Sequence, residues 1–178
     1  MRFVHLADVQ LDTSSAGRSA AVRRRLREPS REAFRRTGDL AIREDANALL
    51  IAGDLFDGAR LSFQTERFLL EQMRRLEQHG VAVVYATGNH DPGSPLPGPR
   101  ALDWPGNVHV AWDATPKRIL IHDREGEPVG YVSAAGHASD QEKRDLSRLI
   151  PAPKGDLPEV ALLHTQVHSS LGAEEHHA

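Results

Sequence analysis

Cysteine is absent from the 178-residue chain, and aromatic residues make up only 5% of it. Without cysteine the protein can form neither a disulfide framework nor a thiolate metal site, so metal ligands would have to be histidine, carboxylate or amide side chains. No apolar run reaches the roughly 18 residues of a membrane span. The apolar start of the chain is also too short for a signal peptide. We therefore expect a protein without membrane segments, located in the cytoplasm.

A strong positive charge is also missing, because the net charge is −3. The chain as a whole is thus not the polycation that nucleic-acid binding by charge alone would require. Locally, however, eight arginines lie between residues 18 and 36, opposed only by Glu28 and Glu32. Such a cluster forms either a solvated helix face or a contact for a phosphate backbone. We name the run Arg23, Arg24 and Arg25 as the candidate nucleic-acid contacts.

Strands and helices alternate in the first half of the chain. Three short apolar runs predict buried strands, at residues 2–7, 48–52 and 81–86. Three segments favour helices, at residues 18–27, 30–44 and 62–78, with Pro29 separating the first two and Ser30 as an N-cap. This order predicts parallel strands with right-handed crossovers, and hence an α/β fold.

The second half has a different pattern. Residues 91–107 are rich in proline and glycine and predict a loop. Short strands follow, which we expect to pair as antiparallel hairpins, at residues 108–112, 118–122 and 129–134. One further helix is expected at residues 140–149, and a last strand at residues 160–163 that ends at His164.

Polar side chains suited to metal binding follow four of these strands, namely Asp8, Asp54, Asn89 and His164. The ligand crevice of an open α/β sheet lies at the carboxyl ends of its strands, so these side chains are expected to converge. Gly53 and Gly88 let the chain turn sharply just before two of them. An oxygen-rich set with some imidazole suits Mn, Fe or Zn, and a carboxylate can bridge two such ions.

Two neighbouring residues supply the remaining parts of a hydrolytic site. His90 follows Asn89 and is free to donate a proton to a leaving oxygen. Asp57 is the candidate carboxylate that orients it. Two metal ions about 3.5–4 Å apart would activate water and orient a phosphate. The pattern therefore predicts metal-dependent hydrolysis of a phosphoester.

Four segments carry a family resemblance: MRFVHLADVQLD, ALLIAGDLFDGA, VVYATGNHDPG and VALLHTQV. Together they resemble the calcineurin-like metallophosphoesterases, and most of all the bacterial SbcD and YhaO-type DNA-repair nucleases. The resemblance covers essentially the whole chain. It implies a four-layer αββα sandwich, in which two mixed β-sheets are flanked by helices.

The same resemblance implies residue roles and partners. Asp8 would bind one metal, Asp54 would bridge both, and Asn89 and His164 would bind the other. His90 would be the catalytic histidine, supported by Asp57. The implied activity is Mn-dependent hydrolysis of DNA phosphodiesters by a repair exonuclease, with Fe or Zn as alternative metals. The implied partners are DNA, a second copy in a homodimer, and a long coiled-coil ATPase of the SbcC type.

The chain departs from the family pattern in two places. The family opens with Asp-x-His, whereas this chain has Asp8-Val9-Gln10, so a weaker amide oxygen of Gln10 stands in for an imidazole ligand. The family's final Gly-His-x-His motif and capping domain are missing, so residues 1–178 are expected to be one metallophosphoesterase domain that is incomplete relative to the family. A catalytically weakened regulatory module and a small-molecule phosphodiesterase remain as alternative functions.

Other histidines and the tryptophans are expected to have structural or surface roles. His5 should pack inside the first strand or support a metal ligand. His137 should lie in a surface loop, with the rim of the crevice as the alternative. His168 could join His164 as a ligand only within a helix, where residues four apart share a face. Trp104 and Trp112 should pack in the core, with base stacking as the alternative.

Overall fold

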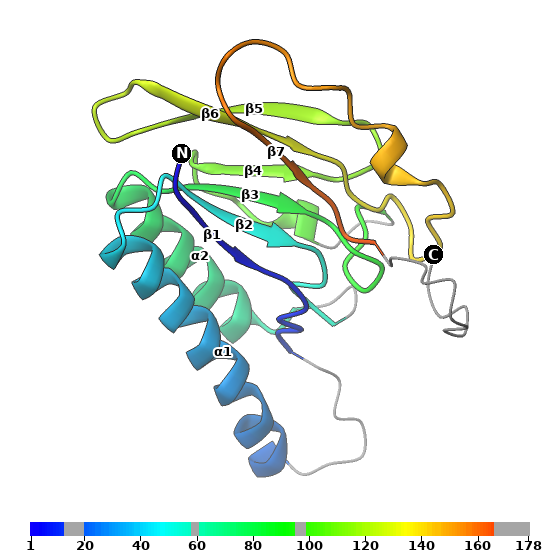
Figure 1. The fold of residues 1–178 in the computed structure, drawn as a ribbon. Coiled ribbons are helices and arrows are strands. Elements are labelled where there is room, and N and C mark those ends of the chain that lie inside the picture. The colour runs from blue at the N-terminus through cyan, green and yellow to red at the C-terminus, as the bar shows by residue number, and fades with distance from the viewer. Residues whose placement is uncertain (13–19, 58–60, 95–98, 166–178) are drawn as a thin grey trace, which may run out of the picture.

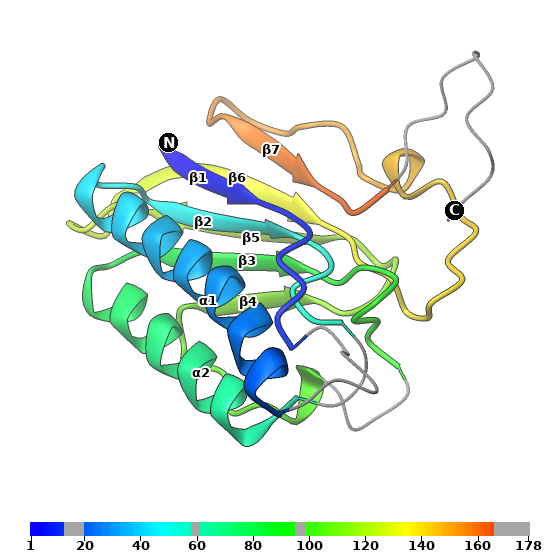
Figure 2. The same cartoon turned by 90° about the horizontal axis from the view of Figure 1, so that it is seen from below.

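The structure is a computed structural model that describes residues 1–12, 20–57, 61–94 and 99–165. In this part of the chain two β-sheets pack face to face, and α1 and α2 cover the outer face of the larger sheet (Figures 1 and 2). The helices are α1 (Ala20–Arg43) and α2 (Phe63–Gln78). The α/β fold with two sheets and helices is thereby confirmed, although both described helices cover the first sheet and only the second sheet is mixed. Neither described helix combines the length and apolarity needed to cross a membrane.

The first sheet is parallel throughout its described strands. Its order is β1 (Phe3–Leu6), β2 (Ala48–Ala52), β3 (Ala82–Ala86) and β4 (Val108–Ala111). We had expected residues 108–112 to form an antiparallel hairpin, and this was wrong, because Val83 pairs with Val108 in a parallel register. The long loop after β3 returns the chain to the edge of the sheet where β3 begins. It is therefore a crossover connection and not a tight turn.

The second sheet contains β5 (Lys117–His122), β6 (Pro128–Ala134) and β7 (Glu159–Leu162) in that order within the described residues. The pair β5 and β6 is antiparallel, as expected, whereas β7 runs parallel to β6. The helix expected at residues 140–149 was wrong, since only a 3₁₀ turn forms there, at Leu146–Arg148. Leu146 is its one buried residue, so the segment lacks the apolar face that stabilises a longer helix.

Helix α1 is continuous through Pro29, so the expected break and the expected N-cap at Ser30 were both wrong. Proline inside a helix removes one hydrogen bond and costs about 3 kcal/mol. Tertiary contacts offset that cost, because Phe34 and Ala41 of the same helix are buried against the first sheet. These contacts join distant segments, so the local sequence around Pro29 does not predict them. Helix α2 begins where expected, with the Ser62 hydroxyl accepting a hydrogen bond from the Thr65 N–H (3.3 Å).

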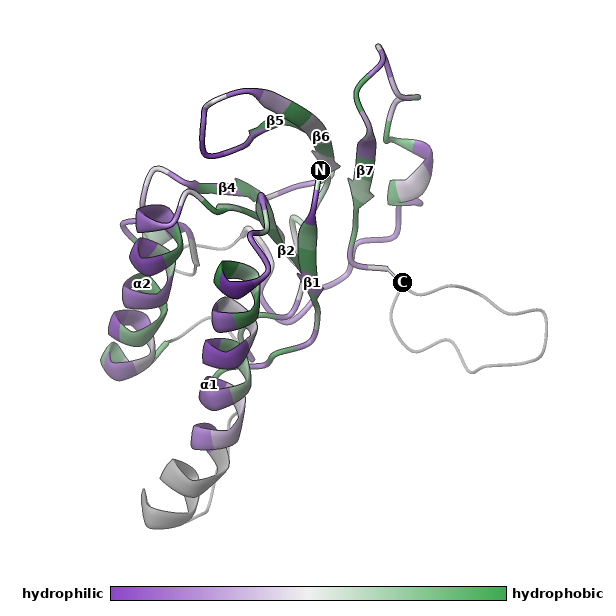
Figure 3. Cartoon of the chain, turned by 60° about the vertical axis from the view of Figure 1, so that its left-hand side comes forward, coloured by the Kyte–Doolittle hydropathy of each residue, from purple (hydrophilic) through white to green (hydrophobic). Residues whose placement is uncertain are grey.

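Two hydrophobic clusters use opposite faces of the first sheet. In β2, Leu49 and Ile51 face the helices, whereas Ala48, Leu50 and Ala52 face the second sheet. Every residue of β2 is buried as a result, which explains why its sequence is a continuous apolar run. Figure 3 shows α2 hydrophobic toward the sheet and hydrophilic on its outer side.

The edge strand β1 is less covered than β2. His5 pairs with Leu50 across the sheet but is exposed, as is Phe3, so the expected packing of His5 was wrong. The position at the sheet edge explains this exposure. The expected packing of Trp104 and Trp112 is confirmed, because both lie against the helix-side cluster and contact the Tyr85 ring.

Candidate metal centre

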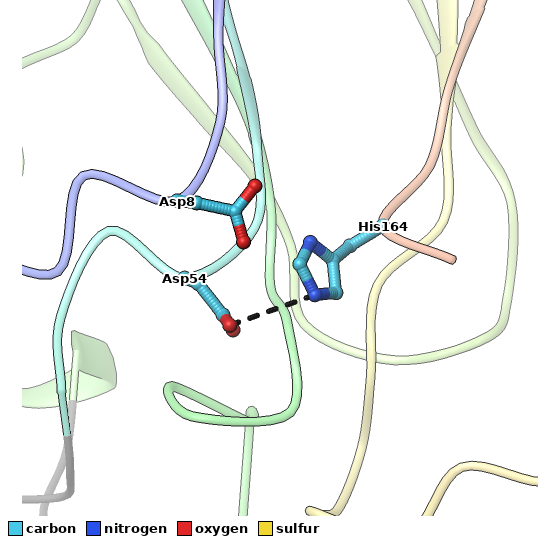
Figure 4. A group of neighbouring side chains, drawn as sticks. All are labelled: Asp8, Asp54 and His164. Carbon is cyan, nitrogen blue, oxygen red and sulfur yellow. Dashed lines mark ion pairs between the residues drawn. The ribbon is translucent and has the colours of Figure 1, made fainter. Parts of the chain in front are cut away.

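Three strands of the two sheets end at one edge and deliver predicted site residues there. Asp8 and Asp54 lie two residues beyond β1 and β2 respectively, and His164 lies two residues beyond β7. One ligand atom from each of these three side chains lies within 4.8 Å of the others. Figure 4 shows the two carboxylates and the imidazole facing one another. The expected convergence of Asp8, Asp54 and His164 is therefore observed, and the ligands come from both sheets.

The loops after β1 and β2 share an uncommon backbone conformation. Asp8, Gln10 and Asp54 have φ angles of 54°, 49° and 51°. Non-glycine residues adopt positive φ rarely, and such strain gathers at functional sites. Backbone hydrogen bonds hold the two loops together, from Asp8 N–H to the Gly53 carbonyl (3.3 Å) and from Gln10 N–H to the Asp54 carbonyl (2.9 Å). The strained turns thus direct both carboxylates into the same crevice.

Glycine is sterically required at two positions beside these side chains. A Cβ atom at Gly53, which has a φ of 73°, would collide with the His164 ring. A Cβ atom at Gly88 would collide with the Asp54 carboxylate and its backbone nitrogen. The glycines of the GDLFD and GNHD segments therefore do more than permit turns, because they leave room for the neighbouring candidate ligands.

Hydrogen bonding fixes the tautomer of His164. Its Nδ1 lies 2.9 Å from the Ala52 carbonyl oxygen, which can only accept, so Nδ1 carries the proton. In the neutral ring Nε2 then presents a lone pair. Metal-bound histidines commonly donate their other N–H to a backbone carbonyl in this way.

The free nitrogen of His164 points at other acceptors. Nε2 lies 3.1 Å from Asn89 Oδ1 and 3.6 Å from Asp54 Oδ2. A divalent cation placed among this nitrogen, the amide oxygen and the carboxylate oxygen would be attracted by all three. Asp54 is only 3% exposed, so water screens its charge little and its attraction for a cation is stronger. The donor set therefore fits a divalent metal bound through oxygen and imidazole.

His90 occupies the exposed side of this centre. Its Nδ1 lies 3.3 Å from Asp57 Oδ1, and its Nε2 lies 4.0 Å from Asp54 Oδ2. Its backbone N–H donates to Asp54 Oδ1 at 3.0 Å. The expected pairing of His90 with Asp57 is thus present, and the His90 side chain is 41% exposed, so a substrate can reach it.

Asp91 is a buried carboxylate whose place in the site was not foreseen. It accepts backbone hydrogen bonds from Leu55 (2.6 Å), Gly88 (2.7 Å), Asp54 (3.1 Å) and Phe56 (3.2 Å), and a further one from the Tyr85 hydroxyl. Burial raises the pKa of Asp91 and, together with the Asp91 charge, raises the pKa of Tyr85 well above its usual value. Tyr85 therefore stays a donor, and Asp91 ties the loop after β2 to the loop after β3.

A second carboxylate, Asp12, holds the loop after β1. It is 8% exposed, its Oδ2 accepts from the Ser62 N–H (2.7 Å), and its Oδ1 lies 3.1 Å from Arg27 Nε. Burial favours the neutral acid, but hydrogen bonds from Ser62 and Thr65 and the Arg27 charge outweigh it and lower the pKa of Asp12. Asp12 was not among the residues expected at the site, and its place next to Leu11, directly after Asp8 and Gln10, is the signal that could have found it.

His137 was expected in a surface loop, and that was wrong, because it is 5% exposed and contacts His164. Burial, reinforced by the nearby His164, lowers the pKa of His137, so its ring is neutral. Gln10 is partly buried beside Asp8. Arg23, Arg24 and Arg25 belong to α1, but their side chains lie outside the described residues, as does the whole of His168.

The amino-acid sequence was also compared with known proteins. Residues 1–177 match the family described as "Calcineurin-like phosphoesterase". The chain is 36% identical to "Uncharacterized metallophosphoesterase YhaO" of Bacillus subtilis over 181 residues, which cover 97% of this chain and 42% of that protein. It is 33% identical to a component of the nuclease SbcCD of Rhodobacter capsulatus over 146 residues, or 75% of this chain and 34% of that protein.

A third relative matches a smaller part of the chain. The chain is 33% identical to "DNA double-strand break repair protein Mre11" of Methanopyrus kandleri over 91 residues, which are 51% of this chain and 19% of that protein. The chain thus spans less than half the length of each of these relatives.

Proposed function

Because the chain belongs to the calcineurin-like phosphoesterase family, we propose that it hydrolyses phosphodiester bonds of DNA with two divalent metal ions. The observation that carries this proposal is the convergence of Asp8, Asp54 and His164, joined by Asn89, with Nε2 of His164 facing oxygen acceptors. A cation among these ligands would be attracted by all of them. Family membership supports a hydrolase acting on phosphoester bonds.

The proposed ligand roles follow from the positions of the side chains. Asp8, with Gln10 beside it, would hold one ion, Asp54 would bridge, and Asn89 and His164 would hold the other. The bound ions would lower the pKa of a water molecule and stabilise charge on the phosphate, and manganese is the proposed metal. Ala52 keeps His164 in the tautomer that ligation requires.

His90 is the proposed general acid. Asp57 Oδ1 accepts a hydrogen bond from the N–H at Nδ1, so Nε2 is the nitrogen that can transfer a proton to a leaving oxygen. The partial exposure of the ring allows direct contact with a substrate. Asp57 would thus fix the orientation of the ring while Nε2 does the chemistry.

DNA is the proposed substrate because of the arginines at the start of α1. That helix runs back along the first sheet, and its first turns project beyond the ends of β1 and β2, on the side of the Asp8 loop (Figure 1). Two of the relatives carry names of a nuclease and a DNA-repair protein. From the resemblance to the SbcD-type nucleases, we also propose a coiled-coil ATPase partner and a homodimer.

The central test is a cleavage assay with Mn²⁺ and a 3′-labelled DNA duplex. We expect Asp54→Asn to abolish cleavage and His90→Asn to reduce it by roughly 10²–10⁴-fold. The matched control is His122→Asn, since His122 is exposed on β5 and should be dispensable. Cleavage by Asp54→Asn at the wild-type rate would contradict the metal mechanism.

A second assay separates DNA from small substrates. Replacing Arg23, Arg24 and Arg25 with alanine should weaken DNA cleavage in a salt-dependent way and spare a chromogenic phosphodiester. The control triple replaces Arg35, Arg36 and Arg43, which lie toward the other end of α1. Unchanged DNA cleavage in the variant lacking Arg23, Arg24 and Arg25 would instead favour a small-molecule phosphodiesterase.

Gln10 favours a second candidate function, a regulatory module with weakened catalysis. An amide oxygen is a poorer ligand than imidazole for Zn or Fe. If this is the reason for weak activity, Gln10→His should tighten metal binding and raise the cleavage rate. Two tightly bound metals in the wild-type protein would rule this candidate out.

A further inference from the structure

The main chain of His137 is hydrogen-bonded to the loop after β3, which carries Asn89 and His90. It lies three residues beyond β6, and its N–H donates to the Thr87 carbonyl (3.0 Å). Its own carbonyl accepts from the Gly93 N–H (2.9 Å) and from the Thr87 hydroxyl (2.8 Å). Thr87 and Gly93 flank the segment that contains Asn89 and His90. The backbone of His137 is therefore fixed relative to that segment.

The side chain of His137 reaches the neighbouring strand end. Its Nε2 lies 2.8 Å from the carbonyl oxygen of His164, and because a carbonyl only accepts, Nε2 is the donor. The two rings also meet edge to face, with centroids 5.6 Å apart at 73°. His137 thus contacts both the main chain and the ring of His164.

His164 is consequently held from two sides. Ala52 of the first sheet accepts from its Nδ1, and His137 of the second sheet donates to its carbonyl. The first contact fixes the orientation of the His164 ring. The second fixes the position of the His164 backbone, to which the ring is attached. Together they aim Nε2 at Asn89 and Asp54.

We propose that His137 is a positioning residue for His164, which it holds in the orientation needed to bind a divalent cation. The inference rests on the proposed function, because it assumes a metal at His164. The residue was not among the ligands expected from the sequence pattern, and it is buried too deeply to serve as a surface contact. Hydrogen bonds of this kind around metal ligands typically account for roughly 10–100-fold in metal affinity.

The test compares two replacements of the ring. His137→Phe keeps a buried ring against His164 but removes the N–H donor, whereas His137→Gln places an amide N–H₂ near the original Nε2 position. The dissociation constant for Mn²⁺ is measured by calorimetry for each variant. The free energy of unfolding without metal is measured alongside, and His122→Phe serves as the exposed control.

We expect His137→Phe to raise the dissociation constant about tenfold or more, and His137→Gln to stay near the wild-type value. A similar affinity of His137→Phe and wild type would overturn the inference while leaving the proposed function intact. Equal weakening by both variants, matched by equal loss of metal-free stability, would also overturn it, because packing alone would explain the result. Failure of the wild-type protein to bind Mn²⁺ would overturn both proposals.

Discussion

The loops after β2 and β3 differ from the loop after β1 in how they are held. Asp91 ties the first two together from inside the protein, through four backbone N–H groups and a tyrosine hydroxyl. The β1 loop has backbone hydrogen bonds to the β2 loop and, beyond them, an outer support, where Asp12 pairs with Arg27 of α1 and with the start of α2. The inner network stabilises Asp54 and Asn89, and the outer one stabilises Asp8 and Gln10. Gln10, where the chain departs from the family pattern, thus lies in the loop whose end is held by an ion pair.

Among the variants that test this contrast, removal of the Asp91 carboxylate should lower the stability of the protein most. Asp91→Ala leaves several buried N–H donors without an acceptor, at about 1–3 kcal/mol each, so we expect a loss of at least about 3 kcal/mol. Chemical denaturation of the metal-free protein measures this. The control is Asp123→Ala, because Asp123 accepts from Glu125 and Glu127 in an outer turn and should cost about 1 kcal/mol or less. Equal losses for the two variants would remove the distinction between inner and outer networks.

Adding a methyl group at Gly88 should lower stability by an intermediate amount. The new Cβ of Gly88→Ala would meet the Asp54 carboxylate, and such overpacking costs about 1–3 kcal/mol. Displacement of Asp54 should also weaken Mn²⁺ binding about tenfold, as measured by calorimetry. The control is Gly38→Ala in α1, where nothing lies within 4 Å and a small gain in stability is expected. Wild-type affinity in Gly88→Ala would show that the tight fit at Asp54 is unimportant.

Neutralising Asp12 should have the smallest effect, and one that depends on pH. The pKa of Asp12 is lower in the folded protein, so its stabilisation is present above the unfolded pKa and is lost as pH falls through the folded value. Asp12→Asn should therefore cost about 1–2 kcal/mol near neutral pH, and the difference from wild type should vanish in acid. Urea denaturation across the pH range measures this.

The control for that comparison is a surface ion pair that joins α1 to α2. Asp39 lies 2.5 Å from Arg75, with both side chains substantially exposed (43% and 40%). Such pairs contribute roughly 0–1 kcal/mol, so Asp39→Asn should change stability little at any pH. A larger loss for Asp39→Asn than for Asp12→Asn would contradict the role given to the buried pair.

The parts of the fold and site that follow local patterns could be predicted from the sequence. The buried strands follow from apolar runs, and the convergence of Asp8, Asp54 and His164 follows from their places after strands of one α/β fold. The pairing of Asp57 with His90 was also foreseen. Each of these depends on periodicity or on chain order, which the sequence contains directly.

The features that could not be predicted depend on packing between distant segments. Helix α1 runs through Pro29 because the first sheet buries Phe34 and Ala41. The parallel direction of β4 depends on the path of a long loop. His137 is buried because the loop after β6 meets the strand that ends 27 residues later at His164. The donors around Asp91 are backbone groups, and no side-chain pattern reveals them.

The candidate ligands are divided between the two sheets, with Asp8 and Asp54 on the first and His164 on the second. An ion bound among them would act as a cross-link, and its binding free energy would add to the cohesion of the sandwich. Chelation should then loosen the contact between the sheets before it affects the helices. Hydrogen exchange in β6 and β7, followed with and without metal, would report the thermodynamic linkage between loading the site and closing the fold.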